Sequence, residues 1–191
     1  MDAVTIQILR NKVASLMEEM HYHFYRSGYS TIIRESRDFS CVILDREGRL
    51  IVAPPMFFHA PVYPHLVERI RKAYGGGKPE IKDGDVFVSN HPYEGGLPHV
   101  SDMAFAAPVF AGGEIVAFSG SIAHKADVGG AVAGSTSADS SPSGNLAIAA
   151  RNSSAAPLRM AAKASLTVRA PKRSHSALTR CAPICVTAIC A

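Results

Sequence analysis

The composition of this chain changes abruptly near residue 140, and that change limits what it can fold into. All 16 acidic residues lie between Asp2 and Asp139, and the aromatic residues, 8 Phe and 6 Tyr, all lie at or before Phe118. A segment without aromatic residues or an apolar period cannot repay the entropy of ordering its backbone. The sequence therefore predicts one folded domain over residues 1–139 and a disordered basic tail, rich in Ser, Ala and Arg, over residues 140–191.

Charge is divided in the same way. The first 139 residues hold 13 of the 20 Lys and Arg against all 16 acidic residues, which gives a net charge of −3 with histidine neutral. The tail holds the other seven and no acid, so the basic pI of the chain does not indicate a nucleic-acid partner. There is no apolar run of transmembrane length and no signal-peptide pattern at the amino terminus. We expect a soluble, cytoplasmic protein with no membrane partner.

Local patterns in the first 139 residues predict an α+β domain. Asp2 can cap a first helix, which Gly28 can end, and His21 and His23 are expected on its solvated side. Apolar residues recur on one face of this helix at spacings of three and four, namely Ile6, Leu9, Val13, Leu16, Met17, Met20 and Phe24.

Three further segments complete the predicted domain. Residues 39–44 and 49–53 read as a hairpin around the turn at residues 45–48, and residues 103–110 and 114–124 read as a second hairpin around Gly112 and Gly113. A short helix over residues 66–74 and a strand over residues 85–89 lie between the hairpins. Cys41 sits alone in an apolar run and is expected to be a buried thiol.

Two short motifs carry the candidate chemistry. Each has a histidine followed three residues later by an aspartate: His99 with Asp102, and His124 with Asp127. Imidazole and carboxylate together suit a borderline divalent cation such as Zn, Mn or Fe, which can polarise a carbonyl or activate water. Such a pair can also be an ordinary surface ion pair, but here both occur in one short region, and each lies near a Gly-Gly that permits close approach of a ligand.

Other chemistries are less well supported by the residues. Ser119 and Ser121 lie near His124, but the nucleophile elbow G-x-S-x-G of serine hydrolases is missing. Cys181, Cys185 and Cys190 have no second Cys or His cluster to complete a zinc knuckle. No Walker or dinucleotide fingerprint is present in the sequence, so the chain alone is not expected to bind a nucleotide.

Three stretches, taken in order, resemble the hydantoinase B/oxoprolinase family. They are RESRDFSCVILDREGRLIV, DGDVFVSNHPYEGGLPHVSDMAFAAPVF and AHKADVGGAVAGSTSADS. The family includes the second subunit of N-methylhydantoinases, the carboxyl-terminal half of 5-oxoprolinase and subunits of acetone carboxylases. Where the family pattern has Asp in N-D-P-Y, this chain has His91, and one extra residue precedes His99. Members are several times longer, so the chain is expected to be an incomplete, amino-terminal part of the domain.

The resemblance implies a division of labour. A hydantoinase A-type, ATP-binding partner phosphorylates a carbonyl or enol oxygen, and the B-type subunit handles the activated intermediate at a metal site. For the carboxylase branch it places the metal on residues matching His99, Asp102 and His124, while Asp127 is the candidate to orient an imidazole. Asn90 is the other residue assigned a catalytic role, at a lower rank than Asp127. His59 and His65 are further lower-ranked candidates.

The resemblance also sets the expected reaction. It implies ATP-dependent opening of a cyclic amide such as a hydantoin or 5-oxoproline. The alternatives are ATP-dependent ketone carboxylation on the same scaffold, or an inactive product of a damaged gene.

The compositional break generates a prediction about the gene. Out-of-frame translation of GC-rich DNA favours Ser, Ala, Pro and Arg, so residues 140–191 are predicted to be a frameshift product. Sequencing the DNA around codon 140 should reveal one insertion or deletion whose reversal restores a long family-like reading frame. If no single change restores such a frame, the tail is a natural basic extension instead.

Overall fold

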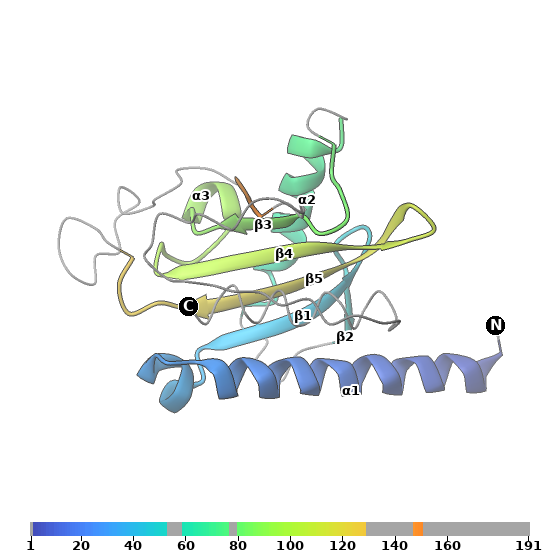
Figure 1. Cartoon of the computed structure of the whole chain (residues 1–191), viewed down its shortest axis with the longest axis horizontal. Coiled ribbons are helices and arrows are strands. Elements are labelled where there is room, and N and C mark those ends of the chain that lie inside the picture. The colour runs from blue at the N-terminus through green and yellow to red at the C-terminus, as the bar shows by residue number, and fades with distance from the viewer. Residues whose placement is uncertain (1, 53–58, 77–79, 129–146, 151–191) are drawn as a thin grey trace.

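The computed structural model describes residues 2–52, 59–76, 80–128 and 147–150, which form three layers (Figure 1). An antiparallel sheet has six strands, in the order β2 (Leu50–Val52), β1 (Phe39–Asp45), β5 (Glu114–His124), β4 (Asp102–Ala111), β3 (Val86–Ser89) and β6 (Ala147–Ala150). Helix α1 (Ala3–Ser27) packs on one face of the sheet, and helix α2 (Val62–Tyr74) packs on the other. The α+β prediction is therefore confirmed for the described residues.

Helix α1 begins and ends where the sequence predicted. The Asp2 carboxylate accepts the backbone N–H of Thr5 at 2.8 Å, which satisfies one of the unpaired donors of the first turn. Gly28 follows the last helical residue and donates its N–H to the carbonyl of Phe24. Only the second half of the predicted apolar face is buried, because the first turns extend past the sheet and leave Ile6 and Leu9 about half exposed (Figure 1).

The two predicted hairpins form the centre of the sheet. Strands β1 (Phe39–Asp45) and β2 (Leu50–Val52) make the first, and β4 (Asp102–Ala111) and β5 (Glu114–His124) make the second. The tight β4–β5 turn uses Gly112 and Gly113 at φ 62° and 87°, a conformation that β-branched residues avoid. Strand β5 also pairs with β1 along the whole length of β1, so the two hairpins join into one sheet.

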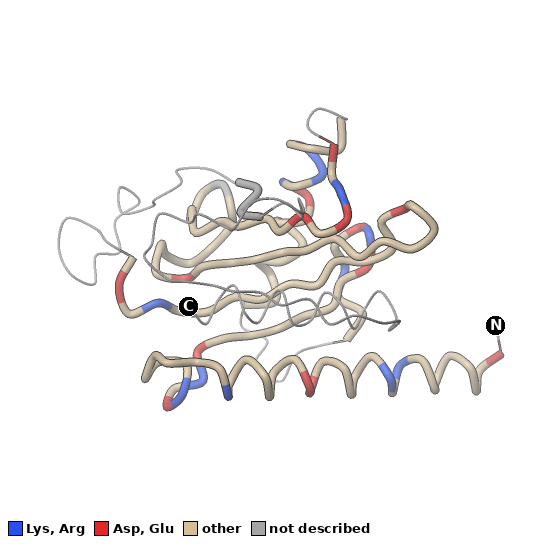
Figure 2. The backbone as a smooth tube through the Cα atoms, in the orientation of Figure 1, with Lys and Arg blue, Asp and Glu red and all other residues tan. Residues whose placement is uncertain are grey.

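Successive side chains of a strand point to opposite faces of the sheet, so the core has two parts, one on each face. On the α1 face, Met20 and Phe24 pack against β-strand residues that include Cys41 and Phe105, and Cys41 is fully buried as predicted. On the α2 face, Leu66 and Ile70 belong to a second cluster with Val42, Phe118 and Ile122. Charged residues lie mainly in the helices and turns and are sparse along the central strands (Figure 2).

Three short elements were not predicted. A π-helical turn, η1 (Ile32–Ser36), precedes β1, and a helical turn, α3 (Pro92–Gly95), follows β3 (Val86–Ser89). Strand β6 (Ala147–Ala150) pairs antiparallel with β3, so the prediction of disorder from residue 140 is wrong for these four residues. The edge of β3 offers unpaired backbone groups that even an Ala-rich segment can satisfy. Residues 129–146 and 151–191 lie outside the described residues.

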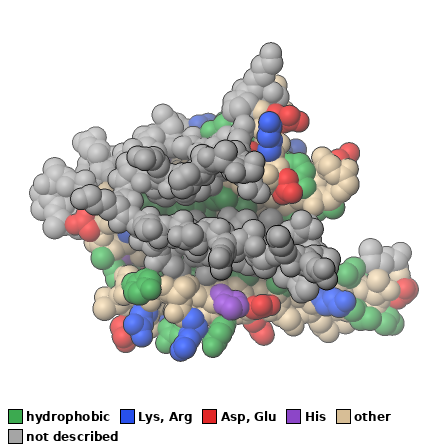
Figure 3. Space-filling model, in the orientation of Figure 1, with side chains coloured by type: hydrophobic (Ala, Val, Ile, Leu, Met, Phe, Trp, Pro, Cys, Tyr) green, Lys and Arg blue, Asp and Glu red, His purple; other side chains and the backbone are tan. Residues whose placement is uncertain are grey.

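The surface of α1 is mixed in character. Hydrophobic, basic and acidic side chains alternate along it in the space-filling view (Figure 3). Within the described part of the chain, no helix is both long and apolar enough to cross a membrane.

His21 is partly buried at the interface between α1 and β1, which corrects its predicted place on the solvated side of the helix. Its Nδ1 lies 3.0 Å from the carbonyl oxygen of Met17, which can only accept, so this nitrogen carries the proton. Its Nε2 then accepts the backbone N–H of Cys41 at 3.4 Å. Burial lowers the pKa of His21, and the Met17 carbonyl opposes that shift only in part.

The lowered pKa of His21 predicts how stability depends on pH. As pH falls below about 6.5, the unfolded chain takes up a proton that the folded imidazole resists, so stability is lost as pH falls. Thermal unfolding between roughly pH 7 and 5 should therefore show a steeper loss of Tm for the unsubstituted chain than for His21→Gln. Equal slopes for the two proteins would contradict the assignment.

Candidate functional site

Two aspartates and one histidine form a row across neighbouring strands at one end of the sheet. Asp102, the first residue of β4, is directly opposite His124, the last residue of β5. Asp38 lies just before β1, and its backbone carbonyl accepts a hydrogen bond of 3.1 Å from the backbone N–H of His124. Residues opposite one another in antiparallel strands have Cβ atoms about 4.5–5.5 Å apart on the same face. The strand pairing alone therefore brings these three side chains together on the α2 face.

His99 joins the row from the loop that precedes β4. The backbone N–H of Asp102 donates to the carbonyl of His99 at 3.2 Å, which makes a tight turn between them. His99 Nε2 lies 3.6 Å from Asp102 Oδ2, and its ring meets the ring of His124 edge-on with centroids 4.8 Å apart. The turn explains why a spacing of three brings His99 and Asp102 together without a helix.

The structure thus brings together the three residues that the sequence singled out as metal ligands. His99, Asp102 and His124 each offer one ligand atom, and these atoms lie within 4.8 Å of one another. Asp102 Oδ1 is 3.3 Å from His124 Nδ1. Asp102 therefore lies beside His124 across the hairpin, although the two residues belong to different motifs.

Two more residues, Asp38 and His59, belong to this cluster. Asp38 was missed by the sequence analysis, and its Oδ2 lies 3.7 Å from His124 Nδ1. His59 was ranked low, yet its Nε2 lies 3.8 Å from Asp38 Oδ1 and 3.7 Å from Asp102 Oδ2. The signal for Asp38 was its place at the start of a strand, which becomes informative only when that strand is known to pair with β5.

An unusual backbone leads the chain into Asp38. The π-helical turn η1 ends at Ser36. Arg37, the next residue, has φ 53° and is the only non-glycine with positive φ among the described residues. The Arg37 guanidinium lies 5.2 Å from the centre of the Tyr25 ring, a contact that helps to hold it there. π-turns and left-handed residues are enriched at functional sites, where strain fixes a side chain in place.

The electrostatics of the cluster favour a cation. The Asp102 side chain is 2% exposed, whereas those of His99 and His124 are 32% and 25% exposed. Asp38 Oδ1, Asp102 Oδ1, His99 Nδ1 and His124 Nδ1 are buried and make no hydrogen bond within the described part of the chain. Burying carboxylates without donors is costly, and two neighbouring carboxylates carry the charge that a divalent cation neutralises. The donor set and its unsatisfied atoms therefore fit a divalent metal.

The remaining predicted residues lie away from this cluster or act structurally. Asn90 is buried and donates its side-chain amide to the carbonyl of Val100 at 3.1 Å, which ties the ends of the loop together. Asp127 is exposed, beyond the end of β5. His65 is half-buried in α2, and the His91 ring contacts Tyr93. Asp127, His65 and His91 do not belong to the group of possible metal ligands found among the described residues.

The rival Ser-His arrangement is wrong. Successive residues of a strand point to opposite faces. Phe118 and Ile122 belong to the core on the α2 face, and His124 shares their parity. Ser119 and Ser121 have the opposite parity, shared with Ala123 in the core on the α1 face, so the sheet separates both hydroxyls from the imidazole.

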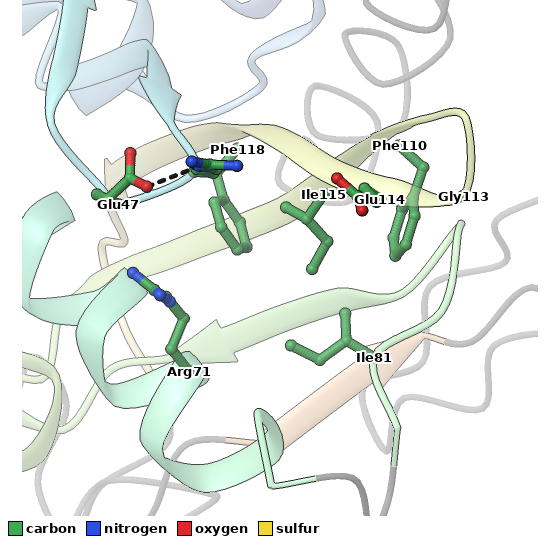
Figure 4. A pocket seen from close by; sticks show the side chains of 9 residues that line it. Glu47, Arg71, Ile81, Phe110, Gly113, Glu114, Ile115 and Phe118 are labelled. Atoms are coloured by element: carbon green, nitrogen blue, oxygen red, sulfur yellow. Dashed lines mark hydrogen bonds and ion pairs between the residues drawn. The ribbon is translucent and has the colours of Figure 1, made fainter.

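A separate pocket of about 510 Å³ lies at the other end of the β4–β5 hairpin. Phe110, Ile115 and Phe118 give it apolar walls, and Arg71 approaches from α2 (Figure 4). Arg46 and Glu47, at the β1–β2 turn, form an ion pair at 2.7 Å beside it. None of the predicted site residues lines this pocket, so the candidate chemistry belongs to the opposite end of the sheet.

Comparison with known proteins identifies relatives over the same part of the chain. Residues 2–143 match the family model described as hydantoinase B/oxoprolinase. The chain is 32% identical over 138 residues to a protein of Pseudomonas sp. (strain NS671) named as the B-type subunit of a D-/L-hydantoinase, covering 70% of this chain and 23% of that protein. It is 34% identical over 136 residues to a 5-oxoprolinase of Dictyostelium discoideum, covering 71% of this chain and 10% of that protein.

Two solved structures share the fold. An ATP-dependent caprolactamase from Pseudomonas jessenii superposes with a TM-score of 0.57 at 26% identity, over 69% of this chain and 22% of that chain. A nucleotide-free acetone carboxylase superposes with a TM-score of 0.58 at 19% identity, over 65% of this chain and 17% of that chain, which shows the fold alone. The chain therefore spans less than a quarter of each of these relatives.

Proposed function

The chain belongs to the hydantoinase B/oxoprolinase family, and we propose that it forms part of a subunit that opens a cyclic amide in an ATP-dependent reaction. The observation that carries the proposal is the cluster of His99, Asp102 and His124, whose ligand atoms lie within 4.8 Å of one another. The names of the relatives support the substrate class, since they include 5-oxoprolinases, a hydantoinase subunit and a caprolactamase.

In this proposal the cluster holds a divalent metal, with zinc, manganese and iron as the candidates. His99 and His124 provide imidazole nitrogens, Asp102 provides a carboxylate oxygen, and Asp38 offers a further oxygen beside His124. A bound divalent ion would polarise a carbonyl oxygen or lower the pKa of a water molecule. The partial exposure of both imidazoles leaves a side open to solvent from which a substrate can approach.

The chain's own residues have distinct parts in this reaction. The β4–β5 pairing fixes Asp102 and His124 relative to one another before any ligand binds. Such preorganisation avoids the cost of rearranging charges during the reaction. Asn90 holds the loop that carries His99, and we assign it this positioning role. Asp127, exposed beyond β5, is the group that can contact a substrate or a partner surface.

ATP chemistry is assigned to a partner. The sequence has no Walker or dinucleotide motif, and we propose that a hydantoinase A-type subunit phosphorylates the amide oxygen. Water then adds to the activated carbon, and the ring C–N bond breaks to give an acyl phosphate and an amine, whose nitrogen takes up the proton. A second water hydrolyses the acyl phosphate to a carboxylate and free phosphate. Ketone carboxylation is the alternative, and it is the weaker one because the acetone carboxylase likeness extends only to the fold.

The metal assignment predicts a binding pattern. The chain purified with Zn²⁺ or Mn²⁺ should bind one ion, and His99→Ala, Asp102→Ala or His124→Ala should abolish binding. Removing the ion with a chelator should lower Tm, since an ion at 100 times its Kd stabilises the fold by about 2.7 kcal/mol.

His91→Ala is the matched control, because His91 lies outside the possible ligand group yet is also half-buried near the loop. It should bind the ion as the unsubstituted chain does. If Asp102→Ala binds the metal as well as the unsubstituted chain does, the metal assignment is wrong. If the unsubstituted chain is insoluble and free of metal, the assignment is also wrong, and the result favours an inactive gene product.

The division of labour predicts where ATP binds and what is consumed. Calorimetry with Mg-ATP should detect no site on this chain alone. With an A-type partner added, ATP hydrolysis should rise with 5-oxoproline, hydantoin or caprolactam and should not require bicarbonate. A stoichiometric ATP site on this chain would overturn the division of labour, and dependence on bicarbonate and a ketone would identify a carboxylase.

A further inference from the structure

A third histidine, His59, lies behind the candidate metal ligands, on the buried side of the cluster. Its side chain is 3% exposed, against 32% for His99 and 25% for His124. It comes from the segment before α2, not from the hairpin that carries His124 or the loop that carries His99. No short motif singles it out, since no aspartate follows it at a spacing of three.

The two carboxylates of the cluster each lie between His59 and His124, and Asp102 Oδ2 also lies 3.6 Å from His99 Nε2. Asp38 presents Oδ2 to His124 at 3.7 Å and Oδ1 to His59 at 3.8 Å. Asp102 presents Oδ1 to His124 at 3.3 Å and Oδ2 to His59 at 3.7 Å. One oxygen of each carboxylate therefore lies toward the partly exposed His124, and the other lies toward the buried His59.

Two anchors fix the place of His59 relative to both carboxylates. Its carbonyl accepts the backbone N–H of Val62 at 3.0 Å, which joins it to the first turn of α2. One residue further on, the Tyr63 hydroxyl bonds to the Ser40 hydroxyl at 2.7 Å and donates to the Ser40 carbonyl at 3.0 Å. Ser40 lies two residues from Asp38, so α2 and β1 hold His59 and Asp38 in a set relation.

Close packing of α2 on the sheet makes this relation rigid. The Tyr63 ring covers Gly120 of β5, where an added Cβ would lie 2.9 Å from the ring. Any side chain at position 120 would push α2, and His59 with it, away from the row of Asp38, His124 and Asp102.

We propose that His59 is a positioning residue that orients the Asp38 and Asp102 carboxylates from the buried side, so that each directs its other oxygen toward the metal. This inference rests on the proposed metal site. Carboxylates that ligate metals are themselves held by neighbouring donors, and removing such a donor typically costs about 10–100-fold in metal affinity. At 3.8 and 3.7 Å the contacts of Nε2 with Asp38 and Asp102 are longer than hydrogen bonds, so an N–H at Nε2 would orient both carboxylates by electrostatic attraction.

The test measures Co²⁺ binding to the full chain by calorimetry and by the visible absorption of the bound ion. His59→Ala should weaken Co²⁺ binding by roughly 10–100-fold while the absorption bands of the saturated protein keep their positions, because the ligands are unchanged. His59→Gln places an amide N–H near the Nε2 position and should recover most of the affinity. His65→Ala, a half-buried histidine of α2 outside the cluster, is the control and should bind as the unsubstituted chain does.

The outcomes separate this inference from the metal site itself. Unaltered affinity in His59→Ala would overturn the positioning role and leave the metal site standing. Shifted absorption bands in both His59 variants would mark His59 as a direct ligand and would also overturn it. If His59→Ala fails to fold, as circular dichroism would reveal, His59→Gln decides: affinity near the unsubstituted value supports the role, and a loss as large as that of Asp102→Ala refutes it. No Co²⁺ binding by the unsubstituted chain would refute both proposals.

Discussion

The antiparallel pairing of β4 and β5 is the interaction on which the rest of the structure depends. Its register places Asp102 opposite His124, and the further pairing of β5 with β1 adds Asp38 to the same row. A shift by one residue would move each of these side chains to the opposite face of the sheet. The tight turn at Gly112 and Gly113, together with the irregularity in pairing between Val109 and Phe110, fixes that register from the far end of the hairpin. The geometry of the cluster is therefore set by backbone hydrogen bonds along the whole hairpin, beginning at a turn that the cluster never contacts.

The cluster itself is unfavourable for the fold in the absence of a counter-ion. Asp102 is almost completely buried, and four polar atoms of the ligands and Asp38 make no hydrogen bond within the described residues. Desolvated carboxylates of this kind destabilise a protein unless a cation or donor compensates them. The apolar contacts of α2 with the sheet, and the Tyr63–Ser40 hydrogen bonds, oppose that cost. The left-handed backbone at Arg37 is a second local cost in free energy, and it lies directly before Asp38, whose side chain it helps to fix in place.

The two faces of the sheet serve different purposes. The α1 face is apolar apart from His21 and small polar residues, and there Cys41, Ser119 and Ser121 are all at most 4% exposed. The α2 face ends in the acidic and imidazole cluster, while the pocket near Phe110 and Phe118 occupies the other end of the hairpin. The cluster is separated from this pocket by the length of the β4–β5 hairpin, so the pocket, with the Arg46–Glu47 ion pair beside it, is a different kind of surface.

The sequence by itself determined the hairpins, the limits of α1 and the three residues His99, Asp102 and His124, because turn glycines, apolar periods and an ordered series of motifs are local signals. It could not identify Asp38 or the nearness of His59 to both carboxylates, and it did not place Asp102 beside His124. It also missed β6, whose Ala-rich residues form a strand only because β3 offers an open edge. These features depend on contacts between residues distant in sequence: His59 and Asp102 are 43 positions apart and meet only when α2 packs on the sheet. Which side chains face one another across strands is decided by register and packing, and neither leaves a pattern in a single short segment.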